Sequence, residues 1–273
     1  MVKIDRLGWA AGLAFRSYGL RVGVRVTDAT AMDHVLDLLP PGWTPAASPI
    51  VDYLYSLVIG GENVSSRIQR FNLVYFDAAR LARSKDLDAV LKNFESHLQL
   101  TVAENARRRV FVHAGVVAWK KNAIVIPGMS MSGKTTLVSK LVEAGATYYS
   151  DEYAVLDEHG LVHPFLRPLG LRRDGEFATQ RVDVEDLGGS RGTKPLSVRL
   201  IISTSYKPGA RWRPRQLTTG KGVLELLANT VSARSQTKLA LRTLPRAIQS
   251  ATILKGVRGE ADEIVESILQ KVA

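Results

Sequence analysis

One segment of the chain combines glycines, a lysine and a threonine at a spacing suited to binding phosphate. Residues 128–135 read Gly-Met-Ser-Met-Ser-Gly-Lys-Thr and fit the pattern G-x-x-x-x-G-K-[ST]. Glycine tolerates positive φ angles, which let successive backbone N–H groups converge on one phosphate. Lys134 supplies a mobile charge for the β- and γ-phosphates of ATP, and Thr135 offers its hydroxyl to Mg²⁺. The expected nucleotide-binding residues are Gly128, Met129, Ser130, Met131, Ser132, Gly133, Lys134, Thr135 and Thr136.

Two adjacent acidic residues, Asp151 and Glu152, follow this loop in the sequence, after a stretch long enough for one helix. They lie between two short stretches that predict strands. Phosphoryl transfer uses a carboxylate close to Mg²⁺, and a second acid or base accepts the proton of an attacking hydroxyl. The pair can supply both groups. Adjacent acids are also common turn residues at strand ends, so their chemical meaning depends on the loop.

The loop is flanked by the elements that such a site requires. Residues 123–126 form a continuous apolar run, which predicts a buried strand before the loop. After the loop, apolar residues recur at helical spacing up to Gly145, which predicts a helix whose N-terminus faces the phosphates. A second apolar run at 110–119 predicts a neighbouring strand and contains His113. A lone histidine in such a run is more often a core residue than a catalytic one.

The first hundred residues predict a mixed α/β region of their own. Apolar patterns predict strands over 21–26, 53–59 and 71–76, and a helix that begins at Asp86. The character of the sequence changes before residue 110. We therefore expect an α/β N-terminal region over 1–105 and a catalytic domain over 106–273.

Composition limits the class of protein. Of 273 residues, 45% are hydrophobic and 23% charged, as is typical of globular proteins, and no apolar run approaches the ~20 residues of a membrane-spanning helix. The absence of cysteine excludes disulfides, thiolate metal sites and cysteine nucleophiles. The apolar stretch 7–15 lacks a basic preceding region because Asp5 lies there, and no cleavage site follows. We therefore expect a cytoplasmic protein.

The net charge of +11 is concentrated near the C-terminus. Residues 188–259 hold 14 Lys or Arg and one acid, Glu225, which gives 14 − 1 = +13. Such a segment attracts anions or an acidic partner, or is simply a solvated surface. It carries no nucleic-acid-binding motif, and only Tyr206 and Trp212 could stack on bases. We therefore do not expect nucleic acid to be the partner.

Three segments together resemble a known family. His113-Ala-Gly-Val-Val, the loop 128–135 and Ser150-Asp-Glu-Tyr-Ala-Val resemble, in order and spacing, successive segments of the catalytic domain of HPr kinase/phosphorylase. The resemblance covers roughly residues 108–175. It implies an α/β fold of the P-loop kinase type found in HPr kinase and phosphoenolpyruvate carboxykinase, here with an α/β N-terminal extension.

The resemblance also implies roles for individual residues. Lys134 and the loop would hold the ATP phosphates, and Thr135 with Glu152 would hold Mg²⁺. Asp151 would be the base on a substrate serine hydroxyl, supported by His113. The family usually has Asp where this chain has Glu152, and Phe165 stands where the family has an acid. The phosphorylase reaction and HPr itself as substrate are therefore not implied.

The sequence thus predicts an ATP- and Mg²⁺-dependent kinase that phosphorylates a serine of an acidic or serine-bearing protein or peptide. Two alternatives stay open. One is a small-molecule kinase with the same site, and the other is a non-catalytic ATP-binding regulatory module. Assembly into a homo-oligomer is compatible with each of them.

Overall fold

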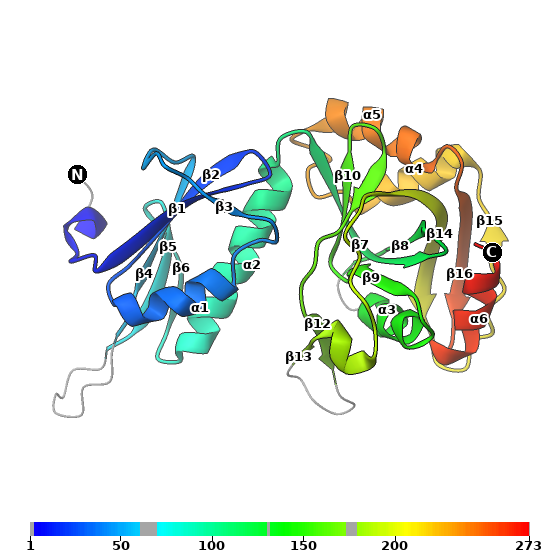
Figure 1. The fold of residues 1–273 in the computed structure, drawn as a ribbon, viewed down its shortest axis with the longest axis horizontal. Coiled ribbons are helices and arrows are strands. Elements are labelled where there is room, and N and C mark those ends of the chain that lie inside the picture. Colours follow the sequence, from blue (N-terminus) through cyan, green and yellow to red (C-terminus); the bar gives the residue numbers. More distant parts are fainter. Residues whose placement is uncertain (1–2, 61–69, 130–131, 173–178, 273) are drawn as a thin grey trace. The chain divides into compact units, whose positions relative to one another are not determined.

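The computed structural model describes residues 3–60, 70–129, 132–172 and 179–272. The chain is a mixed α/β protein whose contacts divide it into two compact units, Met1–Arg107 and Arg108–Ala273. Figure 1 shows the ribbon of both units. Within the described ranges, every helix is too short or too polar to cross a membrane.

The first unit is built on a six-stranded sheet in the order β3-β1-β2-β4-β5-β6. Its strands are β1 (Ala11–Ser17), β2 (Leu20–Val26), β3 (Thr44–Pro45), β4 (Tyr53–Val58), β5 (Asn72–Phe76) and β6 (Ala79–Ser84). β2 and β4 are parallel, whereas the other neighbouring strands are antiparallel. The turn between β1 and β2 places Tyr18 and Gly19 at φ values of 47° and 86°, as a tight two-residue hairpin requires.

The helices of the first unit are η1 (Lys3–Arg6), η2 (Ala29–Ala31), α1 (Met32–Asp37) and α2 (Leu87–Asn105). Asp86 caps α2, because its side chain accepts a hydrogen bond from the Asp88 backbone N–H. The apolar stripe Val90, Phe94 and Leu98 is fully buried and joins the strand residues in one core. The strands and the helix that the sequence predicted in this region are therefore observed.

The second unit is built on an eight-stranded sheet with the path β11-β10-β7-β8-β14-β16-β15, in which β9 also pairs with β7. Its strands are β7 (Arg109–Trp119), β8 (Asn122–Pro127), β9 (Thr147–Ser150), β10 (Tyr153–Asp157), β11 (Leu161–His163), β14 (Leu196–Tyr206), β15 (Arg215–Gln216) and β16 (Thr252–Arg258). A separate two-stranded sheet pairs β12 (Leu169–Arg172) with β13 (Thr179–Val182). β8, β14 and β16 are mutually parallel, so their carboxyl ends share one edge of the sheet.

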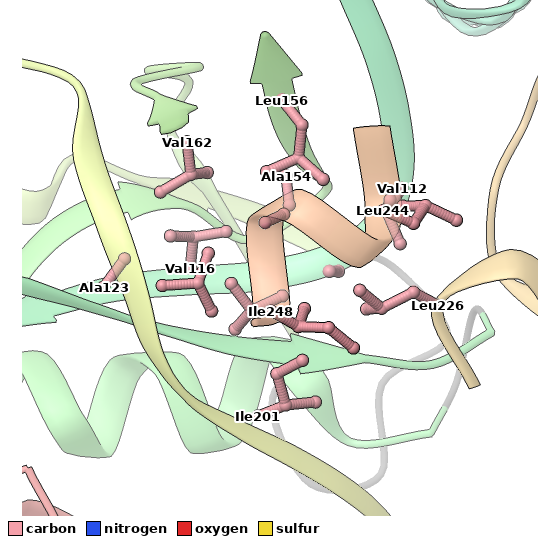
Figure 2. Close-up of a cluster of buried hydrophobic side chains, with 14 of the residues drawn as sticks. Val112, Val116, Ala123, Ala154, Leu156, Val162, Ile201, Leu226, Leu244 and Ile248 are labelled. Atoms are coloured by element: carbon pink, nitrogen blue, oxygen red, sulfur yellow. The ribbon is translucent and has the colours of Figure 1, made fainter. Parts of the chain in front are cut away.

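Helices cover both faces of this sheet. They are α3 (Lys134–Glu143), η3 (Val184–Leu187), α4 (Thr219–Ala228), α5 (Thr237–Ile248) and α6 (Asp262–Gln270). α4 and α5 pack on one face, where the cluster drawn in Figure 2 includes Val112, Ile201 and Leu244, and α3 and α6 pack on the other. Gly115 allows the close approach of α3 to β7, because a Cβ atom there would lie 2.5 Å from Val138 Cγ2.

Candidate active site

The strand predicted before the phosphate-binding pattern and the helix predicted after it are observed as β8 and α3. Gly133 is the N-cap of α3 and has φ +80°, a left-handed conformation that favours glycine. Gly128 has no room for a side chain, because a Cβ atom there would lie 2.7 Å from Ser132 Oγ. Ser130 and Met131 lie outside the described residues. The described part of the pattern therefore ends on the first turn of α3, and the N-terminus of a helix favours an anion.

Lys134 is the first residue of α3, and the residue is 7% exposed. Its Nζ donates a hydrogen bond of 2.8 Å to the carbonyl oxygen of Met129, so the lysine folds back over the loop. Burial lowers the pKa of Lys134 to about 8, although the charges of Asp151 and Glu152 oppose the shift. Because the ammonium group of Lys134 has three N–H donors and uses one of them on Met129, the others are available to an anion.

Asp151 is held by three donors just after β9. Thr135 Oγ1 donates to its Oδ2 at 3.1 Å, the Gly170 backbone N–H to the same oxygen at 3.3 Å, and the Tyr148 hydroxyl to Oδ1 at 3.0 Å. The Tyr148 hydroxyl also lies 2.8 Å from the Arg167 carbonyl oxygen, so its hydrogen is shared between the two acceptors. Burial raises the pKa of Asp151, and the three hydrogen bonds counteract that shift.

Glu152 differs from its neighbour in that its carboxylate accepts no hydrogen bond from the described residues. No side chain or backbone N–H among the described residues donates a hydrogen bond to its carboxylate oxygens. The turn itself is fixed by Ser150, whose Oγ accepts from the backbone N–H groups of Glu152 and Tyr153. Burial, followed by the charge of Asp151, raises the pKa of Glu152 to about 7, whereas Lys134 acts in the opposite direction.

His113 lies on β7 and buttresses the start of the loop. Its Nδ1 is 3.1 Å from the Gly128 carbonyl oxygen, and the Gly128 N–H donates to the His113 carbonyl at 3.1 Å. Because a carbonyl oxygen only accepts, we assign the ring proton to Nδ1, which leaves Nε2 as an acceptor. Burial, reinforced by Lys134, lowers the pKa of His113, so the ring is neutral at pH 7. Its ring forms a T-shaped contact with the ring of Tyr153, with centroids 5.5 Å apart.

The donor set suits a magnesium-bound polyphosphate. Magnesium is usually held by one or two carboxylates and by the phosphates themselves, not by a cage of protein ligands. Thr135 and Asp151 already share a hydrogen bond, and Glu152 adds a second carboxylate. In the described part of the chain, no three His, Cys, Asp or Glu side chains converge as a complete metal cage. Ser132 Oγ is buried and makes no hydrogen bond to any described residue.

Two residues next to this site were missed by the sequence analysis. Tyr148 lies in the stretch before Asp151 that predicted only a strand, and its hydroxyl contacts Asp151. Arg258 was counted only as one of the basic residues of 188–259. Its Nη2 donates 2.9 Å to the carbonyl oxygen of Gly133, so it contacts the last residue of the loop. Nothing local in the sequence marks Arg258, because 125 residues separate it from Gly133.

The basic segment is not one uniform surface. Arg191 forms ion pairs with Asp183 and Glu185, and Lys255 pairs with Glu225, the sole acid of the segment. Arg258 is 2% exposed. Several of the 14 cations are thus already engaged within the fold, and the field available to an acidic partner is smaller than the sequence suggested. Phe165, which replaces the acid of the resembled family, is a core residue whose ring packs edge-on against Phe111 and Tyr153.

The fold and the site together define a mixed α/β protein with a glycine turn, a lysine and two carboxylates at one sheet edge. No family model matches the sequence, and no curated protein matches it. Among solved structures, the chain is similar to the Hpr(Ser) kinase/phosphatase from Coxiella burnetii at 14% identity and a TM-score of 0.34. The alignment covers 59% of this chain and 95% of that one. A likeness this low bears on neither the reaction nor the substrate.

Proposed function

We propose that this chain is an ATP- and Mg²⁺-dependent phosphotransferase that moves the γ-phosphoryl group to a hydroxyl, with a serine of a protein or peptide as the acceptor. The observation that carries the proposal is the hydrogen bond from Thr135 Oγ1 to Asp151 Oδ2. It joins the residue after the loop lysine to the acidic pair, which is the combination that holds Mg²⁺ beside a nucleotide in P-loop enzymes.

The loop amides and Lys134 would bind the β- and γ-phosphates, with Lys134 exchanging the Met129 carbonyl for phosphate oxygens. Thr135 and Asp151 would hold Mg²⁺, whose charge neutralises the phosphate oxygens during transfer. His113 orients the loop at Gly128 and, being neutral, adds no competing charge.

The side-chain contacts favour exchanging the roles that the resemblance implied for the two acids. The carboxylate of Asp151 is occupied by three donors, one of them Thr135, which suits a residue fixed beside the metal. Glu152 is unengaged among the described residues and has a pKa of about 7, which suits a general base at neutral pH. Glu152 would take the proton of the acceptor hydroxyl while the oxygen of that hydroxyl attacks the γ-phosphorus. The bond from that phosphorus to the β–γ bridging oxygen breaks, and ADP leaves.

The experiment incubates the full chain with γ-labelled ATP and whole-cell lysate. Acid-stable label on a protein or peptide is expected. Label confined to small metabolites would instead support a small-molecule kinase, and ATP binding without any transfer would support a regulatory module.

Two variants separate the roles of the acids. Glu152→Gln should bind Mg·ATP normally and lose transfer, whereas Asp151→Asn should lose the Mg²⁺ dependence of ATP binding. The opposite pattern would restore Asp151 as the base and Glu152 as the metal ligand.

A further inference from the structure

The two sides of the loop differ in chemistry. In the order of the sheet, β7 lies on one side of β8, and beyond it β9 leads into Asp151 and Glu152. On the other side, β14 and β16 run parallel to β8 and end together, with Tyr206 opposite Arg258. Ligands of open α/β sheets bind outside the carboxyl ends of such strands. One flank of the loop therefore carries carboxylates, and the other carries an aromatic ring and a guanidinium.

Arg258 and Tyr206 lie directly against the end of the loop. Besides its bond to the Gly133 carbonyl oxygen, Arg258 donates from Nη1 to the Gly259 carbonyl oxygen at 2.9 Å. Its Cζ lies 5.4 Å from the centroid of the Tyr206 ring. A Cβ atom built on Gly133 would lie 3.8 Å from Tyr206 Cβ and would collide with Arg258 Nη2. The ring, the guanidinium and the first turn of α3 are thus immediate neighbours.

Tyr206 combines a fixed position with an open surface. Its hydroxyl donates to Glu260 Oε1 at 2.8 Å, and the next residue, Lys207, donates from its backbone N–H to the Arg258 carbonyl oxygen at 2.9 Å. The residue is nevertheless 45% exposed, whereas Arg258 beneath it is 2% exposed. The Tyr206 side chain is fixed at its hydroxyl and at the adjacent backbone, and it is about half exposed. It therefore offers a flat stacking surface that loses little conformational entropy when a base binds.

We propose that Tyr206 is the stacking platform for the base of the nucleotide, and that Arg258 positions both this ring and the end of the loop. The inference rests on the proposed function. The γ-phosphate must face Asp151 and Glu152 for transfer to occur, so a nucleotide held by the loop extends its nucleoside toward the opposite flank. Stacking on a single ring accepts any base and favours the larger purines, because every base has a π face.

The test compares ATP with inorganic tripolyphosphate, which has the phosphates but no nucleoside, by equilibrium binding to the full chain. Tyr206→Ala should weaken ATP binding by about 10- to 100-fold and leave tripolyphosphate binding unchanged, as expected for the loss of one stacked base. Tyr206→Phe, which keeps the ring, is the matched control and should bind ATP within about threefold of the unaltered protein.

A second measurement does not depend on how well the variant folds. The ratio of ATP to UTP affinity within each protein should favour ATP in the unaltered chain and fall toward one in Tyr206→Ala. Equal weakening of ATP and tripolyphosphate, or no weakening of ATP, would overturn the stacking role. If the unaltered protein bound neither ligand, the proposed function would fail first, and this inference would fail with it.

Discussion

Replacing Lys134 by methionine should make the ligand-free protein more stable while abolishing its response to nucleotide. The lysine is 7% exposed and has one hydrogen-bond acceptor, the Met129 carbonyl. Burying its charge therefore costs desolvation free energy and destabilises the folded state. An uncharged side chain of similar length avoids that cost.

The magnitude follows from the pKa. Lowering the pKa of Lys134 from 10.5 to about 8 disfavours its charged form in the folded state. At about 1.4 kcal/mol per pH unit, the charged lysine destabilises the fold by roughly 3 kcal/mol. The penalty is full below pH 8 and fades as the pH rises toward 10.5, where the lysine is neutral in the unfolded chain as well. Allowing about 1 kcal/mol for the hydrogen bond lost by Met129, the net gain is about 2 kcal/mol.

Calorimetry of the full chain measures this gain as a shift in the melting of the second unit. A change of ~2 kcal/mol in a domain of this size raises the melting temperature by roughly 4–8 °C. Adding Mg·ATP at 100 times its dissociation constant should stabilise the unaltered protein by about 2.7 kcal/mol and the Lys134→Met variant not at all. With nucleotide bound, the unaltered protein should therefore be at least as stable as the Lys134→Met variant.

Lys140→Met is the matched control, since Lys140 lies on the same helix in partly exposed ion pairs with Glu143 at 2.8 Å and with Asp262 at 3.5 Å. Removing these surface pairs should change stability by less than ~1 kcal/mol. The reasoning would be refuted if Lys134→Met melted at or below the unaltered protein at pH 7. It would also be refuted if the gain did not shrink between pH 7 and pH 9.5.

Three further outcomes are expected. Because the pKa of Glu152 is raised to about 7, the rate of phosphoryl transfer should rise with pH through about 7 as the base loses its proton, and a pH profile of Glu152→Gln should lack this rise. Gly133→Ala should cost about 1–2 kcal/mol for its positive φ, displace Arg258 and weaken ATP binding, which melting and titration will detect together. In the first unit, Tyr55→Phe removes a buried hydroxyl bonded to His97 Nδ1 at 2.8 Å; it should lower the stability of that unit by about 1–2 kcal/mol and leave ATP affinity unchanged.

The part of the site that lies close together in the sequence could be predicted from it. Glycine spacing before Lys134 and an apolar run before Gly128 indicate a strand, a turn and a helix, and the strand and the helix are observed as β8 and α3. β6, in contrast, could not be recognised. It is a largely exposed edge strand whose sequence includes two arginines, so it lacks the apolar alternation by which strands are detected.

The flank formed by Tyr206 and Arg258 could not be predicted, because it depends on β14 and β16 being parallel neighbours of β8. The sequence marked Tyr206 only as a stacking residue for nucleic acid. The proposed division of roles between Asp151 and Glu152 was also beyond the sequence. Adjacent residues in a turn point in different directions, and only the contacts with Thr135 and Tyr148 distinguish them.

The four charged groups around the loop are all shifted toward their neutral forms by burial. The pKa values of Lys134 and Arg258 are lowered, and those of Asp151 and Glu152 are raised. Opposite charges close together usually favour one another's ionised forms, but desolvation outweighs that attraction at Lys134, Glu152 and Arg258. At Asp151 it outweighs the hydrogen bonds that favour the ionised form. A polyphosphate supplies the anion that the two cations lack, and its metal supplies the cation that the two acids lack. The polyphosphate would thus favour the charged forms of the two cations, and the metal would favour the charged forms of the two acids. Neither the polyphosphate nor the metal alone would favour the charged forms of all four groups.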